Sequence, residues 1–263
     1  MQSEAIQLWS RGLPPKPKFP PGVTPCDKCP IRKLEGFRRF TPEELAFMLE
    51  FKSGELSVEP NTTILSEGSD GPHLYTVLSG WVFKYKTLED GRRQVINFGL
   101  PGDLIGLQAS MFDVMTHSVE ALTDVTLCIL PRAKVWPLYK NFEGLAFDVT
   151  WLAAREEMLL SDYLATVGQR NSIERVAFVL LDLFRRARRS GLVKKDEMTL
   201  PIAQQLLADT IGFSLVHTNK MLQKLRRTGC FNWTNSTFVM RDEAKLAGIA
   251  MASEPIERVR PFL

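Results

Sequence analysis

Two cysteines lie close together near the start of the chain, and two others stand far from them. Cys26 and Cys29 are separated by two residues, whereas Cys128 and Cys230 belong to later segments. Thiolates at this spacing can ligate a soft metal ion or form a redox pair. Four cysteines so unevenly distributed do not make the disulfide framework of a small secreted domain. In a reducing compartment, we expect the close pair to be free thiols or metal ligands.

The other residues that could do chemistry give little support for an enzyme. The chain has 3 histidines in 263 residues, and we find no glycine-rich phosphate loop, serine nucleophile elbow or metal-spaced histidine pair in the sequence. A cupin-like barrel enzyme needs histidines and carboxylates clustered on its strands, and the strand-like segments lack them. His73 and His117 are isolated, which is more typical of ordinary polar residues than of haem ligands. We expect a protein that is not an enzyme.

A basic helical segment offers a different chemistry, the binding of a polyanion. Within residues 199–229, apolar residues recur at helical spacing, Gly212 suits a tight turn and Ser214 suits the N-cap of a second helix. Residues 170–230 contain 12 Lys and Arg against 5 Asp and Glu, whereas the whole chain has 33 against 30. Such a local surplus is what a DNA-binding surface requires. The pattern predicts a helix-turn-helix, although an amphipathic hairpin with a solvated charged face would give the same periodicity.

Short strands precede this unit and must help to position it. Residues 52–131 alternate short apolar runs with glycines and other turn residues, which indicates an antiparallel sandwich or barrel. Asp90-Gly91 is the clearest hairpin turn, and residues 119–122 and 125–130 are typical of closing strands. Thr41 followed by Pro42 predicts the start of a short helix just before the strands.

After the strands the pattern becomes helical. Apolar residues recur every three to five positions from Phe147 to Leu164, which predicts a helix longer than most. Such a helix either folds over the strands or pairs with the same helix of a second subunit. A further amphipathic helix over residues 172–187 leads into an arginine run at 185–189. That run would also suit a membrane-surface binder, but it continues into the helix-turn-helix.

The expected fold class is α+β, with an N-terminal antiparallel β-barrel of the jelly-roll type, a long dimerisation helix and a C-terminal helix-turn-helix with a two-stranded wing. The expected segments are a proline-rich leader, the barrel with short flanking helices, the dimerisation helix, the DNA-binding domain and a tail with too few apolar residues to assign: 1–25, 26–140, 141–168, 169–250 and 251–263. We find neither an apolar run of about eighteen residues nor a signal-peptide core, so we expect a cytoplasmic protein with no membrane partner.

This order of elements resembles the Crp/Fnr family of bacterial transcription regulators over about residues 26–250. The motifs that carry the resemblance are Leu74-Tyr75-Thr76-Val77-Leu78-Ser79-Gly80, Pro101-Gly102-Asp103-Leu104-Ile105-Gly106, Ile211-Gly212-Phe213-Ser214 and Val216-His217-Thr218-Asn219-Lys220. The likeness is greater to the fumarate and nitrate reduction branch than to the cyclic-AMP receptor branch. It implies a homodimer on a two-fold symmetric double-stranded DNA site, with RNA polymerase as partner if the protein is an activator.

The resemblance also assigns the DNA-reading residues. They are Ser214, Val216, His217, Asn219, Lys220, Lys224 and Arg226. Family members usually carry a glutamate and an arginine on the recognition helix, and Val216 and Lys220 stand at those positions. A valine can contact a thymine methyl group but cannot accept a hydrogen bond from a cytosine amine. We therefore expect the half-site to differ from the family's usual one at that base.

The cyclic-nucleotide site of the family corresponds to another set of residues. They are Gly102, Asp103, Ile105, Gly106, His117 and Ser118. By the resemblance, Ile105 replaces the glutamate that holds the ribose, and His117 replaces the arginine that holds the phosphate. A neutral imidazole is a poor substitute for a guanidinium facing phosphate. We do not expect cyclic AMP to be the effector, and we leave the ligand unknown.

An iron-sulfur cluster is the second candidate signal. The oxygen-sensing relatives have three N-terminal cysteines and one on a late strand. Cys26, Cys29 and Cys128 match three of these, but Glu35 stands at the fourth position. Three soft ligands remain where four are usual, so Glu35 or Asp27 would have to complete the set. Alternatively, Cys128 is a buried strand residue and the close pair is a redox or zinc-binding turn.

A third interpretation is that the barrel has lost its ligand. The protein would then be controlled by its abundance or by oxidation of Cys26, Cys29 or Cys230. We expect Cys230 to lie in the core. All three interpretations share one function, the sequence-specific binding of DNA by a regulator. They differ in whether the barrel receives a redox, oxygen or small-molecule signal, or no signal at all. The direction of regulation and the operator sequence stay open.

Overall fold

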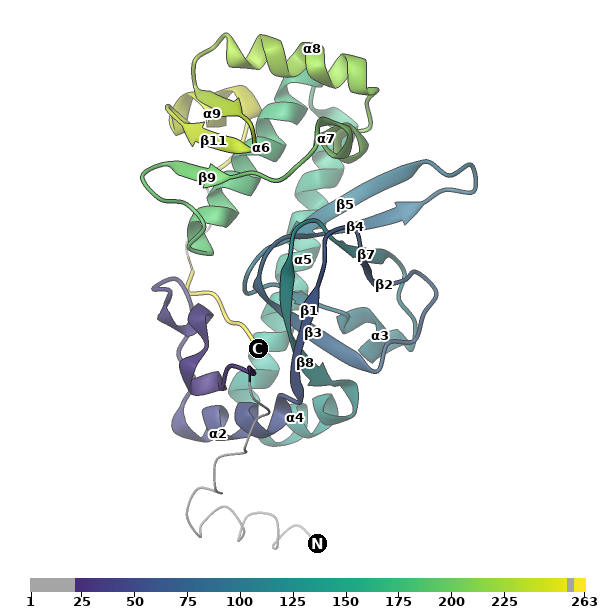
Figure 1. Cartoon of the computed structure of the whole chain (residues 1–263), viewed down its shortest axis with the longest axis vertical. Coiled ribbons are helices and arrows are strands. Elements are labelled where there is room, and N and C mark those ends of the chain that lie inside the picture. The colour runs from purple at the N-terminus through teal and green to yellow at the C-terminus, as the bar shows by residue number, and fades with distance from the viewer. Residues whose placement is uncertain (1–21, 255–257) are drawn as a thin grey trace, which may run out of the picture.

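The computed structural model describes residues 22–254 and 258–263. The proline-rich leader predicted for residues 1–25 lies almost wholly outside them. The described chain forms an N-terminal domain of two sheets and a C-terminal domain of helices and a small sheet, with one long helix beside both (Figure 1). Among the described helices, none is long and apolar enough to cross a membrane.

The N-terminal domain holds two antiparallel sheets of four strands each, ordered β1-β8-β3-β6 and β2-β7-β4-β5. The strands are β1 (Gly54–Val58), β2 (Thr63–Leu65), β3 (His73–Ser79), β4 (Val82–Thr87), β5 (Arg93–Gly99), β6 (Leu104–Ile105), β7 (Ser118–Ala121) and β8 (Val125–Pro131). Side chains of both sheets, such as Val77 and Val119, share one core. The jelly-roll-like sandwich is confirmed, but the sheets do not close into the predicted barrel. The edge strands β2 and β6 span only 3 and 2 residues, too few to join the sheets.

Short helices flank the sheets. They are the 3₁₀ turns η1 (Cys26–Lys28), η2 (Pro30–Lys33) and η3 (Arg132–Lys134), and the helices α2 (Pro42–Phe51), α3 (Leu107–Phe112) and α4 (Val135–Asn141). The predicted helix start at Thr41 is confirmed: its hydroxyl accepts from the Glu44 amide at 3.2 Å, and the Glu44 carboxylate accepts from the Thr41 amide at 2.8 Å. This reciprocal capping satisfies two amides that the helix itself cannot.

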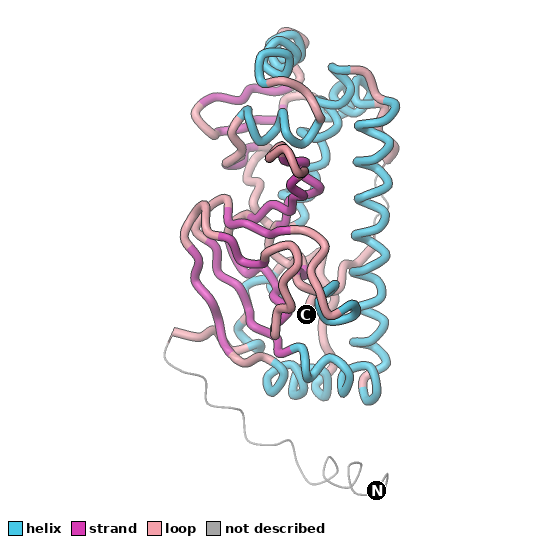
Figure 2. The backbone as a smooth tube through the Cα atoms, turned by 90° about the vertical axis from the view of Figure 1, so that its right-hand side faces the viewer, coloured by secondary structure: helices cyan, strands magenta, loops and turns pink. Residues whose placement is uncertain are grey.

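The long helix α5 (Glu143–Gln169) runs along one side of the sheets (Figure 2). Its buried side chains include Leu145, Val149 and Leu152. On other faces Phe147 is 67% exposed and Leu164 is 71% exposed. The helix therefore does fold over the strands, and it also leaves large apolar side chains without cover in the described chain.

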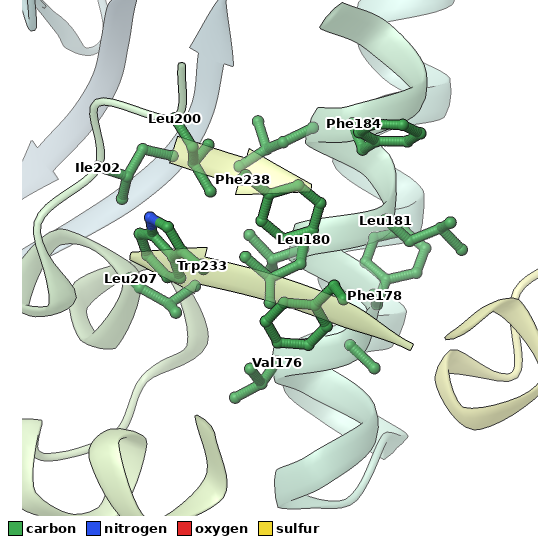
Figure 3. Packing of buried hydrophobic residues seen from close by; sticks show 14 of the residues in the cluster. Val176, Phe178, Leu180, Leu181, Phe184, Leu200, Ile202, Leu207, Trp233 and Phe238 are labelled. Carbon is green, nitrogen blue, oxygen red and sulfur yellow. The ribbon is translucent and has the colours of Figure 1, made fainter. Parts of the chain in front are cut away.

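The C-terminal domain is built around α6, whose side chains pack against the small sheet (Figure 3). Its elements are α6 (Ser172–Arg189), β9 (Glu197–Thr199), α7 (Gln204–Ile211), α8 (Leu215–Arg226), β10 (Phe231–Thr234), β11 (Thr237–Met240) and α9 (Glu243–Ala250). The predicted two-stranded wing is present as β10 and β11, and β9 adds a third strand to it. Val176, Leu180 and Phe184 on α6 form the centre of the core with Phe238 of β11.

The two domains share a continuous apolar core. Trp81 at the start of β4 and Phe98 of β5 belong to the same buried cluster as the α6 side chains. The Gln94 amide of β5 also donates to the Thr210 carbonyl of α7 at 3.1 Å. The sheet that contains β4 and β5 thus contacts the C-terminal domain directly.

The end of the described chain returns to the N-terminal domain. Residues 258–263 run back beside the first turns of the chain (Figure 1), and the Arg260 amide donates to the Gly36 carbonyl at 2.9 Å. Phe262 and Leu263 are buried. No local pattern predicts this docking, because two large apolar side chains are too few to give a periodicity.

Candidate nucleic-acid interface and ligand pockets

The helix α8 lies at one end of the molecule, far from α2 and α4 (Figure 1). The turn before it depends on Gly212, whose φ of 71° is left-handed. Ser214 caps the helix by accepting from the His217 amide at 3.3 Å. Both roles follow the sequence prediction. The first turn of α8 is thereby fixed in place, with Leu215 and Val216 exposed.

The outer face of α8 carries Val216, Lys220 and Lys224. Val216 is 80% exposed, and both lysines are exposed. Leu222 and Leu225 are buried on the opposite face. Leu215, the first residue of the helix, is 39% exposed.

The side chains of three other predicted DNA-reading residues are packed, buried or hydrogen-bonded within the C-terminal domain. The His217 ring packs edge-on against Phe213, with ring centroids 4.8 Å apart. His217 Nε2 and Asn219 Oδ1 are buried and have no hydrogen-bond partner in the described structure. Arg226 donates to the Trp233 carbonyl at 2.7 Å, which fastens α8 to β10. Of the seven predicted residues, Val216, Lys220 and Lys224 are thus the ones whose side chains face outward freely.

The arginine run of α6 is engaged within the C-terminal domain. Arg185 and Arg188 both bond the Glu243 carboxylate, at 2.8 and 2.7 Å, and Arg188 also bonds Asp196 at 3.1 Å. Arg186 is 5% exposed. Part of the local positive surplus therefore stabilises the domain, whereas Lys220 and Lys224 of α8 remain exposed.

A pocket of about 380 Å³ lies between the β6–α3 region and α5. Four of the six predicted effector residues line it: Asp103, Ile105, Gly106 and His117. Gly102 instead packs against the Phe37 ring, and the Ser118 hydroxyl accepts from the Glu67 amide at 3.0 Å.

The cations that line this pocket, Lys84 and Arg155, are already paired with carboxylates. Lys84 bonds Glu156 at 2.7 Å, and Arg155 bonds Asp103 at 3.0 Å. Burial and then the charge of Lys84 lower the pKa of His117 to about 4, so its imidazole is neutral at pH 7. A phosphate entering this pocket would have to compete with carboxylates for its cations.

Asp103 is the centre of a buried ion cluster that the sequence did not reveal. Arg155 of α5, Arg186 of α6 and Arg260 all bond its carboxylate. The Leu100 amide donates to it at 2.7 Å. Burial alone would raise the pKa of Asp103, but the three guanidinium charges hold it well below its usual range. No local signal predicts the cluster, because its members lie up to 157 positions apart.

Cys26, Cys29 and Cys128 line one pocket, as the resemblance implied. Its free volume is only about 20 Å³, room for about one water molecule. Phe262 and Leu263 line the same pocket, whereas Glu35 is exposed and does not. Across residues 22–254 and 258–263, no three His, Cys, Asp or Glu side chains are grouped to hold a metal ion. This arrangement of the cysteines does not fit an iron-sulfur cluster.

The three thiols are protonated at neutral pH. Burial raises the pKa of Cys26 to about 12 and also raises the pKa values of Cys29 and Cys128. The Cys26 thiol donates to the Met48 carbonyl at 3.4 Å. Cys230 is 0% exposed, which confirms its predicted place in the core. A thiolate reaction at Cys26, Cys128 or Cys230 first requires the surroundings to open, whereas Cys29 is half-buried.

Comparison with known proteins agrees with this arrangement. Residues 55–142 match the cyclic nucleotide-binding domain, and residues 174–249 match the Crp-like helix-turn-helix domain. The nitrogen fixation regulation protein FixK of Bradyrhizobium diazoefficiens is 30% identical over 234 residues, which are 86% of this chain and 94% of FixK. The transcriptional activatory protein AadR of Rhodopseudomonas palustris is 30% identical over 169 residues, 64% of this chain and 69% of AadR.

The fold is also similar to a solved structure, that of FixK2 from Bradyrhizobium japonicum. The TM-score is 0.69 at 27% identity, and the match covers 76% of this chain and 98% of FixK2. Together with the exposed recognition helix, these similarities show that the chain belongs to the Crp/Fnr family and is a DNA-binding transcription regulator.

Proposed function

We propose that this regulator acts as a homodimer that pairs along α5 and reads a two-fold symmetric DNA site with its two α8 helices. The observation that carries the proposal is the uncovered apolar side of α5. Phe147, Trp151 and Met158 recur at spacings of four and seven residues, as in a paired helix. Phe147 is 67% exposed and Met158 is 44% exposed. Large apolar groups at this spacing are typical of a subunit interface.

The recognition helix supplies the reading surface. Its first turns present Val216 and Lys220, and in helix-turn-helix proteins the start of the second helix meets the base edges. Lys224, one turn further along, is placed to meet phosphate. With the two-fold axis between the paired α5 helices, the half-sites would lie about one helical turn of DNA, roughly 34 Å, apart.

The relatives suggest the direction of regulation. AadR is named a transcriptional activatory protein, and a further relative, FnrL of Cereibacter sphaeroides, is named a transcriptional activator. Activation in the cytoplasm through contact with RNA polymerase is therefore the mode that we propose. Any signal must bind the DNA-competent and the incompetent arrangement with different affinity, because equal affinity shifts no equilibrium.

A second proposal concerns that signal. The cysteine pocket is filled by Phe262 and Leu263, and the cations of the pocket between the β6–α3 region and α5 are paired with carboxylates. Both observations favour a ligand-independent or thiol-controlled regulator over one that carries a cluster or cyclic AMP. Visible spectra with iron and sulfide analysis, after aerobic and after anaerobic purification, test this. A protein with stoichiometric iron and sulfide would contradict the proposal.

The dimer is tested by a matched pair of variants. Phe147→Asp places a charge in the exposed apolar stripe of α5, and Trp136→Asp places the same charge at a similarly exposed apolar residue of α4 (67% and 76%). We expect light scattering to find a dimer for the parent chain and Trp136→Asp, and a monomer for Phe147→Asp. Sites selected from a random DNA pool should be palindromic for the two dimers alone. A parent chain that is a monomer and selects no site in either redox state would overturn the proposal.

A further inference from the structure

Residues 260–263 are held in the N-terminal domain along their whole length. Arg260, Pro261, Phe262 and Leu263 are all buried, whereas Arg258 and Val259 just before them are exposed. The backbone of Arg260 pairs with the segment around Phe37: its amide donates to Gly36 at 2.9 Å, and its carbonyl accepts from Arg38 at 2.8 Å. Burial thus begins at the residue where the segment meets the domain.

Four side-chain contacts define a binding site for this segment. The Arg260 guanidinium bonds the Asp103 carboxylate and lies over the Phe37 ring, 5.2 Å from its centroid. The Phe262 ring stacks on Phe40 at 5.1 Å and meets Phe37 edge-on at 5.6 Å. Such ring contacts need a defined geometry, so they select for an aromatic group at this position.

Leu263 occupies the far end of the site, at the cysteines. Its carbonyl accepts from the Thr76 hydroxyl, and its side chain belongs to the buried cluster that contains Cys26 and Cys128. Both thiols are at most 9% exposed. The volume left beside the cysteines is about 20 Å³, so Leu263 and any larger group at the thiols exclude one another.

The same segment connects the site to the C-terminal domain. It follows α9, whose end is held by α6 and the end of α5: Arg170 donates to the Ala250 carbonyl at 2.9 Å, and Arg185 donates to the Ser253 carbonyl at 3.2 Å. Asp103, which binds Arg260, also binds Arg186 of α6 at 3.1 Å. Release of Arg260 would therefore change the charge balance at the carboxylate that holds α6.

We propose that the N-terminal domain contains a peptide-binding site for the chain's own Arg260-Pro261-Phe262-Leu263, and that release of this segment exposes Cys26 and Cys128. The ligand class is a basic-apolar peptide, with arginine for Asp103, an aromatic ring for Phe37 and Phe40, and an aliphatic end for the thiol pocket. Burial of Phe262 and Leu263 and the Arg260–Asp103 ion pair favour docking. The ordering of the short segment and the desolvation of the Arg260 guanidinium oppose it. Because these contributions are of comparable size, the segment can exchange between bound and released states. This inference does not depend on the proposed dimer or its DNA site.

The test measures how fast each thiol reacts in the full chain. Iodoacetamide labelling followed by peptide mass spectrometry reports Cys26, Cys128 and Cys230 separately, and Cys230, 0% exposed in the other domain, is the internal control. In the double variant Phe262→Ala, Leu263→Ala we expect Cys26 and Cys128 to be labelled at least about tenfold faster, because labelling follows the open population. Cys230 should be unchanged. Val259→Ala, a change at a residue 63% exposed in the same segment, should leave all three rates as they are. Equal rates for Cys26 and Cys128 in the parent and the double variant would overturn the proposal.

A synthetic peptide of residues 258–263 completes the test. Added to the double variant, it should slow the labelling of Cys26 and Cys128 back towards the parent rate, and a peptide of the same composition in scrambled order should not. If the double variant also labels faster at Cys230, its fold has loosened, and the peptide then decides. Selective protection of Cys26 and Cys128 supports the site, and no protection, or equal protection by the scrambled peptide, rules it out.

Discussion

Arg186 of α6 and Asp103 of the N-terminal domain form a buried ion pair at 3.1 Å, with both residues about 95% covered. The same guanidinium donates to the Asn97 side chain at 2.6 Å and to the Phe98 carbonyl at the end of β5. One side chain of the DNA-binding domain is thus fixed to two segments of the sheet domain. The placement of α6, and with it α8, depends on the turn that contains Asp103.

Replacement of Asp103 should destabilise the protein strongly. Asp103→Asn keeps the size of the side chain but removes its negative charge, which leaves Arg155, Arg186 and Arg260 buried without their shared carboxylate. Breaking a buried pair in this way costs about 3–5 kcal/mol. We expect urea denaturation to find a loss of that order in the free energy of unfolding.

A surface ion pair provides the control for Asp103→Asn. Glu67 lies 3.3 Å from Lys86, and both side chains are at least 40% exposed. Glu67→Gln should change the free energy of unfolding by less than about 1 kcal/mol, because exposed pairs are screened by solvent. If both variants lost the same free energy of unfolding, the Asp103 cluster would not be what fixes α6 to the sheet domain.

His117 should make stability depend on pH in the acidic range. Burial and the charge of Lys84 lower its pKa to about 4 in the folded chain, against about 6.5 in an unfolded one. Between these values the unfolded chain binds a proton that the folded chain does not, so stability should rise with pH from about 4 to 6.5 and level off above. The contribution is present above pH 6.5 and is lost as the pH falls towards 4.

His117→Gln isolates this effect from the carboxylates that titrate in the same range. We expect the variant to lose less free energy of unfolding than the parent between pH 7.5 and pH 5, as measured by denaturation at each pH. Identical pH profiles for the two proteins would show that His117 does not remain neutral in the folded state at pH 5.

The parts of the fold that the sequence predicted depend on local signals. Thr41 and Glu44 lie three positions apart, as do Ser214 and His217. Both partners of each capping hydrogen bond therefore lie within one helical turn. Gly212 marks its turn because a left-handed residue is costly for other side chains. The spacing of Phe147 and Leu164 likewise extends over a single helix. Short-range patterns of this kind can be recognised without knowledge of how the rest of the chain folds.

The parts that could not be predicted depend on contacts between distant segments. Asp103 and Arg260 are 157 positions apart, and Thr76 and Leu263 are 187 apart. The two-residue strand β6 has no pattern of its own and forms by pairing with β3. The expected DNA-reading role of Arg226 rested on its place in the helix, whereas its bond to Trp233 depends on how β10 folds back. Such pairings follow from packing, which the sequence alone does not display.

Asn219 and Lys220 should contribute to specificity, whereas Lys224 should contribute to affinity alone. Asn219 Oδ1 is buried in the described structure, so its side chain must turn outward to pair with adenine, whereas Lys220 already faces outward and can pair with guanine. We expect Asn219→Ala and Lys220→Ala each to weaken binding to the selected site by about 1–3 kcal/mol and to random DNA by less. Lys224→Ala should weaken both about equally and reduce the salt slope by about one. Titrations on operator and random DNA at matched salt measure this. Equal losses on both DNAs for Asn219→Ala and Lys220→Ala would contradict the assignment.

Val216 offers a direct test of which base the first turn of α8 reads. It is 80% exposed, so substitution there should not disturb the fold. Val216→Glu introduces an acceptor for a cytosine amine and removes the methyl groups that can contact thymine. We expect sites selected from a random pool to change to cytosine at one position in each half-site, with a discrimination of about 1–3 kcal/mol. Val216→Ala is the matched control, because it loses apolar contact without gaining an acceptor and should relax the preference there. If Val216→Glu selects the same base as the parent, the side chain at this position does not reach the base edges, and the docking of α8 must differ from the one proposed.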